Sequence, residues 1–226
     1  MIVLSSISHW NLSPSGQDIA LRDPDVRLML EVREGNAASF EELMRRFQGR
    51  VLSVLKHLVG NQELAEDLTQ DVFFRVYRAR LNYVPGAKFS TWLFTIANNV
   101  ALNALRSKNR RPEVQFGGQA PPQSNVEESR FQMENAIQAS SGMIPARRMD
   151  KMELNEIVKH AIDSLGERQK MATLLHRFEG MSYAEIAETM DLTPQAVKSL
   201  LCRARLTLKD LLLPYIEDGK MVGDNS

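Results

Sequence analysis

The chain has 226 residues, of which 43% are hydrophobic and 25% are charged, and its formal net charge at pH 7 is +0. This length predicts one or two domains with real hydrophobic cores, and no apolar run approaches the roughly 18 residues that a membrane span needs, so no membrane insertion is expected. Because the net charge is zero, nucleic-acid binding cannot be argued from the total and must come from local patches. The single cysteine, Cys202, excludes an intramolecular disulfide and fits a reducing cytoplasm, and the four histidines lack metal-ligand spacing.

The first half of the chain is predicted to hold four helices. Residues 1–22 show no periodicity and are expected to form a loose tail. Apolar residues recur at three- and four-residue steps in three segments that predict helices: Asp25–Glu34, Ala37–Val59, and a segment from Asn61 or Gln62 to Arg80. Leu81–Phe89 contains Pro85-Gly86 and is predicted to be a loop, after which Ser90 is expected to cap a fourth helix from Thr91 to about Asn109.

The third predicted helix begins with an acidic segment. Between Glu63 and Asp71 there are four carboxylates and no basic residue. One interpretation is structural, because acids stabilise the positive N-terminal end of a helix dipole. The other is a docking surface for a basic partner, and the physics favours neither.

The fourth predicted helix carries an unusual polar stripe. At alternating steps of four and three residues it presents Trp92, Ile96, Asn99, Asn103, Arg106 and Arg110. Asparagine is a poor residue for a helix interior, so two on one stripe ahead of two arginines require a reason. Nucleic acid is one reason, because aromatic rings stack on bases, amides read base edges and arginines hold phosphates. A solvated helix face with a buried tryptophan is the alternative.

The composition changes at Arg111–Asp150, which contains four prolines, Gly117-Gly118 and few large apolar residues. A flexible linker is predicted here, so the chain should fold as two small helical domains of the all-α class. The second domain should begin with a helix near Lys151, and Ser164 with Glu167 is expected to form a capping box for the next helix.

The second domain contains the strongest motif, Ser182–Lys209. Ser182 and Glu185 predict a capping box, Asp191-Leu192-Thr193 a turn, and Thr193 followed by Pro194 the start of a second helix. The polar side of that second helix carries donors and almost no acid: Gln195, Lys198, Ser199, Cys202, Arg203, Arg205 and Lys209. This pattern is typical of a helix-turn-helix that enters the major groove. An ordinary helical hairpin with a solvated basic face is the alternative. Pro214 should end the helix, and residues 217–226 are expected to be loose.

The parts resemble, in order, those of a bacterial extracytoplasmic-function (ECF) sigma factor, the smallest class of RNA polymerase sigma subunit. The segments similar to sigma region 2 are FEELMRRF (Phe40–Phe47), AEDLTQDVFFRVYR (Ala65–Arg78), FSTWLFTIA (Phe89–Ala97) and Asn98–Arg111. Those similar to region 4 are AIDSLGERQKMATLLHRF (Ala161–Phe178) and Gly180–Leu208. The resemblance implies region 2 over residues 23–111, a linker over 112–150 and region 4 over 151–216.

The resemblance also implies roles. Core RNA polymerase would be bound through its β′ coiled coil and β flap, with the coiled coil meeting Glu66, Asp67, Gln70 and Asp71. The −10 promoter element would be held by the loop Leu81–Phe89 and by Trp92, Asn99, Asn103, Arg106 and Arg110, with Asn99 in the pocket for a flipped base. The −35 element would be read by Thr193, Gln195, Lys198, Ser199, Cys202 and Arg203. An anti-sigma factor is the further partner that the family implies.

Two other function classes fit the sequence less well. A stand-alone DNA-binding regulator would use only the helix-turn-helix, but it would leave the acidic helix and the Trp/Asn/Arg stripe without a role. An enzyme is not expected, because no catalytic constellation, glycine-rich phosphate loop or metal spacing is present, and no cofactor is implied.

Overall fold

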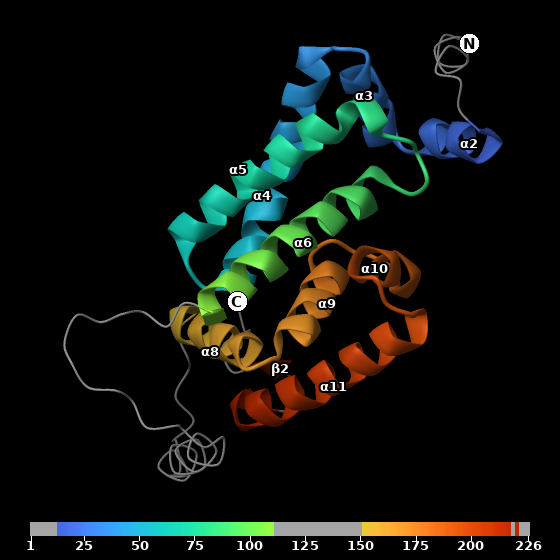
Figure 1. Ribbon diagram of the computed structural model, residues 1–226. Coiled ribbons are helices and arrows are strands. Elements are labelled where there is room, and N and C mark those ends of the chain that lie inside the picture. Colours follow the sequence, from blue (N-terminus) through green and yellow to red (C-terminus); the bar gives the residue numbers. More distant parts are fainter. Residues whose placement is uncertain (1–12, 111–150, 218–219, 222–226) are drawn as a thin grey trace.

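The computed structural model describes residues 13–110, 151–217 and 220–221, and these form two helical blocks (Figure 1). The first block holds α2 (Pro14–Arg22), α3 (Pro24–Arg33), α4 (Ala37–Val59), α5 (Gln62–Ala79), the short 3-10 helix η2 (Arg80–Asn82) and α6 (Phe89–Arg110). The second holds α8 (Lys151–Asp163), α9 (Glu167–Arg177), α10 (Tyr183–Met190), α11 (Pro194–Leu212) and the 3-10 helix η3 (Leu213–Tyr215). The predicted all-α fold is confirmed. The predicted linker lies outside the described residues.

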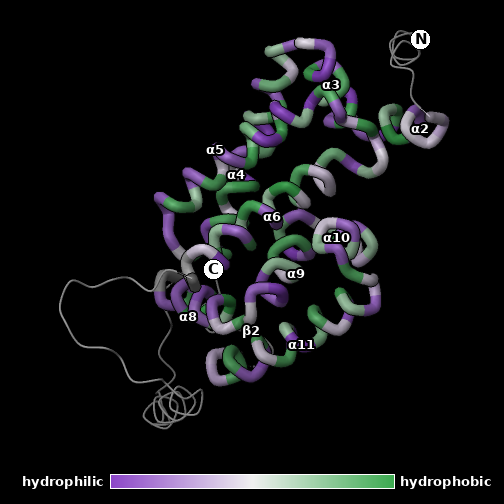
Figure 2. Tube along the Cα trace, in the orientation of Figure 1, coloured by the Kyte–Doolittle hydropathy of each residue, from purple (hydrophilic) through white to green (hydrophobic). Residues whose placement is uncertain are grey.

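The core of the first block lies between α4, α5 and α6, which pack pairwise, with α3 packed on α4. Its largest fully buried side chains are aromatic and aliphatic: Met29, Leu30, Leu43, Phe47, Leu55, Phe89, Leu93 and Phe94. Hydrophobic segments of α4 and α6 meet in the middle of Figure 2. The helices bury most of the apolar stripes that their three- and four-residue periodicity predicted, and Tyr77 of α5 is an exception.

The prediction of a loose N-terminal tail is wrong for residues 13–22. Ser13 caps α2 by accepting a hydrogen bond from the Gly16 N–H at 3.2 Å, and Pro14 occupies the first helical position. Ala20 is fully buried, and the Arg27 side chain donates to the carbonyls of Ala20 and Leu21, both at 2.9 Å. Ser-Pro is a helix start signal as well as a loop signal, and only the packing on α3 decides between them. Residues 1–12 lie outside the described residues.

A second difference concerns the end of the chain, where residues 217–226 were expected to be loose. Ile216–Glu217 (β1) and Lys220–Met221 (β2) form a short antiparallel pair, with Ile216 opposite Met221. The pair is too short to change the fold class.

The helix-turn-helix forms as predicted. Ser182 Oγ accepts from the Glu185 N–H at 3.3 Å, and Glu185 accepts from the Ser182 N–H at 2.8 Å, so the capping box is complete. Thr193 caps α11 through the Ala196 N–H at 3.2 Å. Asp191 between the helices has the left-handed conformation, with φ of 53°, and it is the one non-glycine residue with positive φ in the described part of the chain.

The capping box predicted for Ser164 and Glu167 is wrong. The Ser164 hydroxyl donates to the Ala161 carbonyl at 2.7 Å instead, and α9 begins two residues later than expected, after Gly166. The Gly166 N–H donates to the Gln169 side chain at 3.2 Å. Two overlapping capping signals compete in this segment, and the packing of α9 selects the second.

The left-handed turn residue gives a first testable prediction. Asp191→Gly is expected to leave the fold unchanged and to raise the free energy of unfolding by up to about 1 kcal/mol, because glycine adopts this conformation without a Cβ penalty. Asp191→Val should lower it by about 1–2 kcal/mol, since a β-branched residue is strained there. Thermal denaturation followed by circular dichroism measures both, and a lower melting temperature for the glycine variant would contradict the prediction.

The two blocks pack against each other, which the sequence did not predict. Helix α10 lies against α6, and α9 lies against α4. Arg50 forms an ion pair with Glu179, whose side chain is only 2% exposed, and Lys88 Nζ lies 2.8 Å from Glu185 Oε1. The His57 ring stacks on Phe178 with centroids 5.8 Å apart. One continuous hydrophobic cluster therefore runs through both blocks.

Candidate functional surfaces

The acidic residues of α5 gather on one exposed face. We call Glu66, Asp67, Gln70 and Asp71 the docking face. The first three are exposed and Asp71 is partly exposed. Asp71 accepts two hydrogen bonds from Arg75 at 3.0 Å, which raises the pKa of that guanidinium, and Glu66 accepts from Gln62 one turn earlier. Asp67 forms no ion pair with any described residue, so its carboxylate is available to a basic partner.

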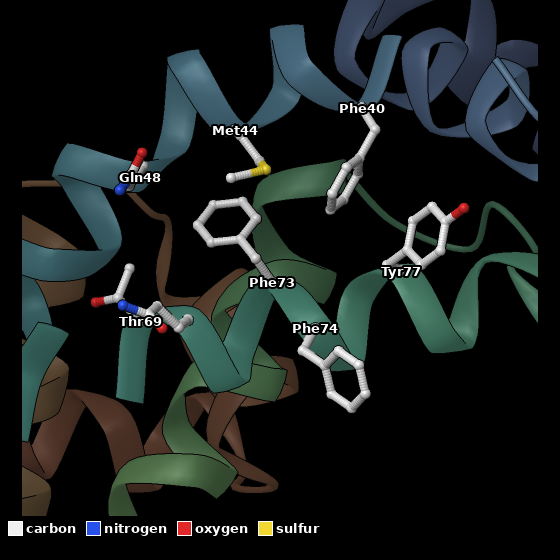
Figure 3. A pocket seen from close by; sticks show the side chains of 8 residues that line it. Phe40, Met44, Gln48, Thr69, Phe73, Phe74 and Tyr77 are labelled. Atoms are coloured by element: carbon white, nitrogen blue, oxygen red, sulfur yellow. The ribbon is translucent and has the colours of Figure 1, made fainter. Parts of the chain in front are cut away.

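An apolar groove of about 280 Å³ continues the docking face along α5. Its walls come from two helices, as the close-up in Figure 3 shows: Phe40, Met44 and Gln48 from α4, and Thr69, Gln70, Phe73, Phe74 and Tyr77 from α5. The Phe40 ring lies 5.1 Å from the Tyr77 ring, centroid to centroid. Phe74 is 60% exposed at the rim, and the Arg78 guanidinium lies 5.7 Å from its ring centre.

Sequence reasoning missed this groove. The four-residue spacing of Phe73 and Tyr77 predicts that both lie on the apolar face of the helix, and Phe73 is indeed buried, but Tyr77 is 42% exposed. The available signal was an apolar stripe wider than one neighbouring helix can cover, because Phe73 and Phe74 are adjacent and point in different directions.

The polar stripe of α6 faces solvent over most of its length. Asn99, Asn103 and Arg106 are exposed and form no ion pair with described residues, while Arg110 is the last residue of the helix. Trp92 is partly buried, with its ring 4.8 Å from Tyr83 and 6.0 Å from Phe89. The indole therefore joins the start of the loop to the start of α6. A partly buried Trp92 beside solvated amides fits the solvated-face interpretation, and nucleic-acid binding by the stripe stays a prediction.

The neighbouring face of α6 is covered by the second block. Asn98 is 4% exposed, and it lines a small cavity between the blocks together with Leu102, Leu105, Arg168, Met171 and Met190. The polar stripe of α6 thus lies beside the contact between the blocks rather than within it.

The polar side of α11 is open along the whole helix. Thr193, Gln195, Lys198, Ser199, Cys202 and Arg203 are all exposed. The Ser199 hydroxyl donates to the Gln195 carbonyl at 3.0 Å, and Arg203 Nε donates to the Ser199 carbonyl at 3.4 Å. Val197, Leu201 and Ala204 are buried on the opposite side. A capped helix presenting donors on one face and packed on the other has the geometry of a recognition helix.

An ion pair between Lys88 and Glu185 links the helix-turn-helix to the first block. Burial raises the pKa of the Glu185 carboxyl, but hydrogen bonds from Lys88 and Ser182 outweigh it and hold that pKa below its ordinary value. The Glu185 bond in turn raises the pKa of Lys88. One carboxylate therefore caps α10 and binds the residue that precedes α6.

The described residues contain neither a metal centre nor a membrane-spanning helix. Within the described ranges, no three His, Cys, Asp or Glu side chains gather in a way that could hold a metal ion. No helix in that same part of the chain combines the length and hydrophobicity needed to cross a bilayer.

Two family descriptions match the chain. Sigma-70 region 2 matches residues 43–111, and Sigma-70, region 4 matches residues 155–208. The first contains the docking face and the α6 stripe, and the second contains the helix-turn-helix as far as Leu208.

Curated relatives extend the match to nearly the whole chain. The RNA polymerase sigma-H factor of Pseudomonas aeruginosa is 30% identical over 88% of this chain and 98% of its own length. The ECF RNA polymerase sigma-E factor of Escherichia coli K12 is 33% identical over 85% of this chain and 96% of its own.

Two solved structures share the fold. CnrH, in complex with the cytosolic domain of CnrY, has a TM-score of 0.58 at 20% identity and covers 85% of this chain and 99% of its own. The sigma factor RpoE from Bartonella quintana, in complex with the anti-sigma factor NepR, has a TM-score of 0.55 at 22% identity and covers 77% and 96%. With both sigma regions present in order, and with relatives of this identity over this length, the chain belongs to the extracytoplasmic-function family of RNA polymerase sigma factors.

Proposed function

We propose that this sigma factor binds core RNA polymerase through the docking face of α5 and reads promoters with α6 and α11. The observation that carries the proposal is the exposure of three chemically distinct surfaces on one chain. One is acidic, one is rich in amides and arginine, and one is a donor face on a recognition helix. The acids suit a basic coiled coil of the polymerase, and the other two suit DNA. A stand-alone regulator would have no use for the docking face.

At the −35 element, α11 enters the major groove of duplex DNA. Lys198 and Arg203 hold phosphates or guanine edges, while Gln195 and Ser199 donate to or accept from bases. Thr193 sits at the N-terminus of α11, where the free N–H groups and the helix dipole favour a phosphate. Cys202 offers a small, weakly polar contact, so a thymine methyl group could lie against it.

At the −10 element, α6 and the preceding loop hold the unpaired strand. Asn99 binds the edge of a base that has left the stack, Trp92 closes the pocket beside the loop, and Asn103, Arg106 and Arg110 follow the strand. Capturing the base offsets the few kcal/mol that unstacking and unpairing cost. Two weak contacts on one chain act together, because the second is intramolecular once the first has formed.

We also propose that the chain performs no catalysis itself, since the polymerase makes the RNA, and that it works in the cytoplasm, where the polymerase and the chromosome are. An anti-sigma factor is proposed as its regulator. The support is that two structures sharing its fold were solved with CnrY and with the anti-sigma factor NepR.

The test is reconstitution with bacterial core polymerase on a sizing column, followed by selection of promoter fragments that the complex transcribes. Co-elution and transcription from fragments with conserved −35 and −10 segments are expected. A chain that does not co-elute with core but binds duplex DNA tightly by itself would overturn the proposal.

The apolar groove gives a second prediction. Phe74→Ser is expected to weaken binding to core polymerase about 10-fold, because burying this exposed ring against a partner removes apolar surface from water and should contribute about 1–2 kcal/mol. Folding should change little, since this side chain is 60% exposed. Binding is measured by titrating labelled core. Leu21→Ser on α2, also an exposed apolar position, is the matched control and should bind like the unchanged chain. Equal affinities for both variants would contradict a role for the groove.

A further inference from the structure

The start of α6 is held by a residue from far away in the sequence. The Phe89 N–H donates to Asp23 Oδ2 at 2.9 Å, across 66 residues. The first N–H groups of a helix have no partner inside the helix and are usually bonded by the side chain just before it. Residue 88 is a lysine, which offers no acceptor, and the predicted cap Ser90 lies inside the helix. Asp23 therefore serves as a cap supplied from outside.

The same carboxylate also caps a second helix. Asp23 Oδ1 accepts the Asp25 N–H at 2.9 Å and so begins α3, while its own N–H donates to the Ile19 carbonyl at the end of α2. Each carboxylate oxygen thus has its own donor. A negative charge at the N-termini of α3 and α6 is also favourable in the fields of both helix dipoles.

The other end of the loop is tied to the same helix. Arg33, in the last turn of α3, donates to the Tyr83 carbonyl at 3.3 Å. Tyr83 is 3% exposed, and its ring packs against Trp92. Phe89 is fully buried against Phe47, with ring centroids 5.1 Å apart. The segment between Tyr83 and Phe89 is therefore anchored at both ends by α3, while Val84 within it stays 71% exposed.

We propose that Asp23 is a positioning residue for −10 recognition, although it lies outside the segment that matches sigma region 2. It fixes the C-terminal end of the loop Leu81–Phe89 and the first turn of α6 before DNA binds. A loop that is already ordered loses less conformational freedom when it receives an unpaired base. This inference rests on the proposed −10 surface and adds a residue that never touches the DNA.

The substitution Asp23→Asn distinguishes the role of the hydrogen bond from the Phe89 N–H from that of the hydrogen bond from the Asp25 N–H. An asparagine has one acceptor oxygen and remains a good helix cap, so α3 can keep its cap, but the Phe89 N–H then loses its acceptor. Asp23→Ser, with a single hydroxyl oxygen, is a second variant of the same kind. Asn36→Ala is the matched control, because it removes the cap of α4, where Asn36 accepts from the Ser39 N–H at 3.3 Å, and the hydrogen bonds of Asn36 do not reach the loop.

The measurement is the affinity of reconstituted holoenzyme for a single-stranded oligonucleotide with the −10 sequence of a promoter that it transcribes. This affinity is divided by the affinity for an oligonucleotide with the same bases in scrambled order, which gives a selectivity ratio. Asp23→Asn is expected to lower this ratio about 10-fold, which corresponds to losing one hydrogen bond to a charged group. Core binding should stay unchanged. Asn36→Ala should lower the melting temperature and leave the ratio unchanged, because a purely structural loss affects both oligonucleotides equally.

The variant Asn99→Ala is measured in the same way. It distinguishes failure of the positioning role of Asp23 from failure of the proposed −10 surface. If Asn99→Ala lowers the ratio and both Asp23 variants leave it intact, the positioning role of Asp23 is wrong and the proposed −10 surface stands. If neither Asn99→Ala nor the Asp23 variants change the ratio, the −10 surface itself is wrong, and the inference falls with it.

Discussion

Asp67→Lys and Asp71→Lys, combined in one chain, are expected to weaken binding to core RNA polymerase by about 100-fold or more. Each substitution replaces an attraction to a basic partner with a repulsion, and like charges facing each other across an interface cost several kcal/mol. Every 1.4 kcal/mol corresponds to a tenfold change in affinity. Titration of labelled core polymerase, or loss of co-elution on a sizing column, measures the effect.

The fold should survive this change. Both side chains lie on the solvent side of α5, and the Asp71–Arg75 pair is a surface ion pair between neighbouring turns, worth about 0.3–0.5 kcal/mol. The control is Glu153→Lys with Asp210→Lys, which changes the net charge equally at two exposed positions of α8 and α11. That variant should still bind core. If the control loses affinity as much as the docking-face variant does, total charge rather than a specific surface governs binding.

Locking the two blocks together is expected to abolish promoter-dependent transcription. The −35 and −10 elements lie about 25 base pairs apart, or about 85 Å of duplex at 3.4 Å per base pair. In the structure α10 packs on both α6 and α11. Packed helices lie about 8–10 Å apart, so the two DNA-reading helices are separated by roughly 20 Å. Both elements can be bound at once only after α10 has left α6.

A cleavable cross-link tests this. In a chain with Cys202→Ser, the substitutions Lys88→Cys and Glu185→Cys put a thiol at each of the two positions that now form an ion pair across the contact between the blocks. A short bis-maleimide reagent containing a disulfide should join them within one free chain. Holoenzyme made from the linked chain should transcribe no more than core alone, and reduction of the reagent should restore transcription.

The controls distinguish the effect of linking the two blocks from the effect of modifying the cysteines. The same chain treated with a monofunctional maleimide gives the activity of a chain that is modified at both positions but not linked, and it should be clearly more active than the linked chain. Failure of the thiols to link in the free chain would contradict the observed packing of α10 on α6. Full activity of the linked chain would show that both promoter elements can be reached without separating the blocks.

The contact between the blocks involves the helix-turn-helix directly. Glu185 completes the capping box of α10 and also binds Lys88, the residue before α6. Arg50 and Glu179 form a second ion pair, and the Glu179 side chain is almost fully buried. Breaking such a pair is costly only while the carboxylate stays out of water, so exposing Glu179 on separation limits the cost of opening.

The sequence by itself determined the helices and the local chemistry of their ends. The bounds of α4, the capping box of Ser182 and Glu185, the cap at Thr193 and the left-handed Asp191 all follow from residues within four positions of one another. Such signals need no knowledge of the rest of the chain, because the partner is always in reach. The exposed positions on α5, α6 and α11 followed in the same way, as the faces opposite the apolar stripes.

Only the tertiary structure decided which of several local options was used and which distant residues met. Pro14–Arg22 forms a helix because Ala20 is buried where α2 packs against α3. Ser164 lost its capping role to the next available signal. The bond from Phe89 to Asp23 joins residues 66 positions apart, and the ion pair of Arg50 with Glu179 joins residues 129 positions apart. Contacts at such separations depend on how whole helices pack against one another. Helices with the same periodicity can pack in several ways, so no local sequence pattern encodes these contacts.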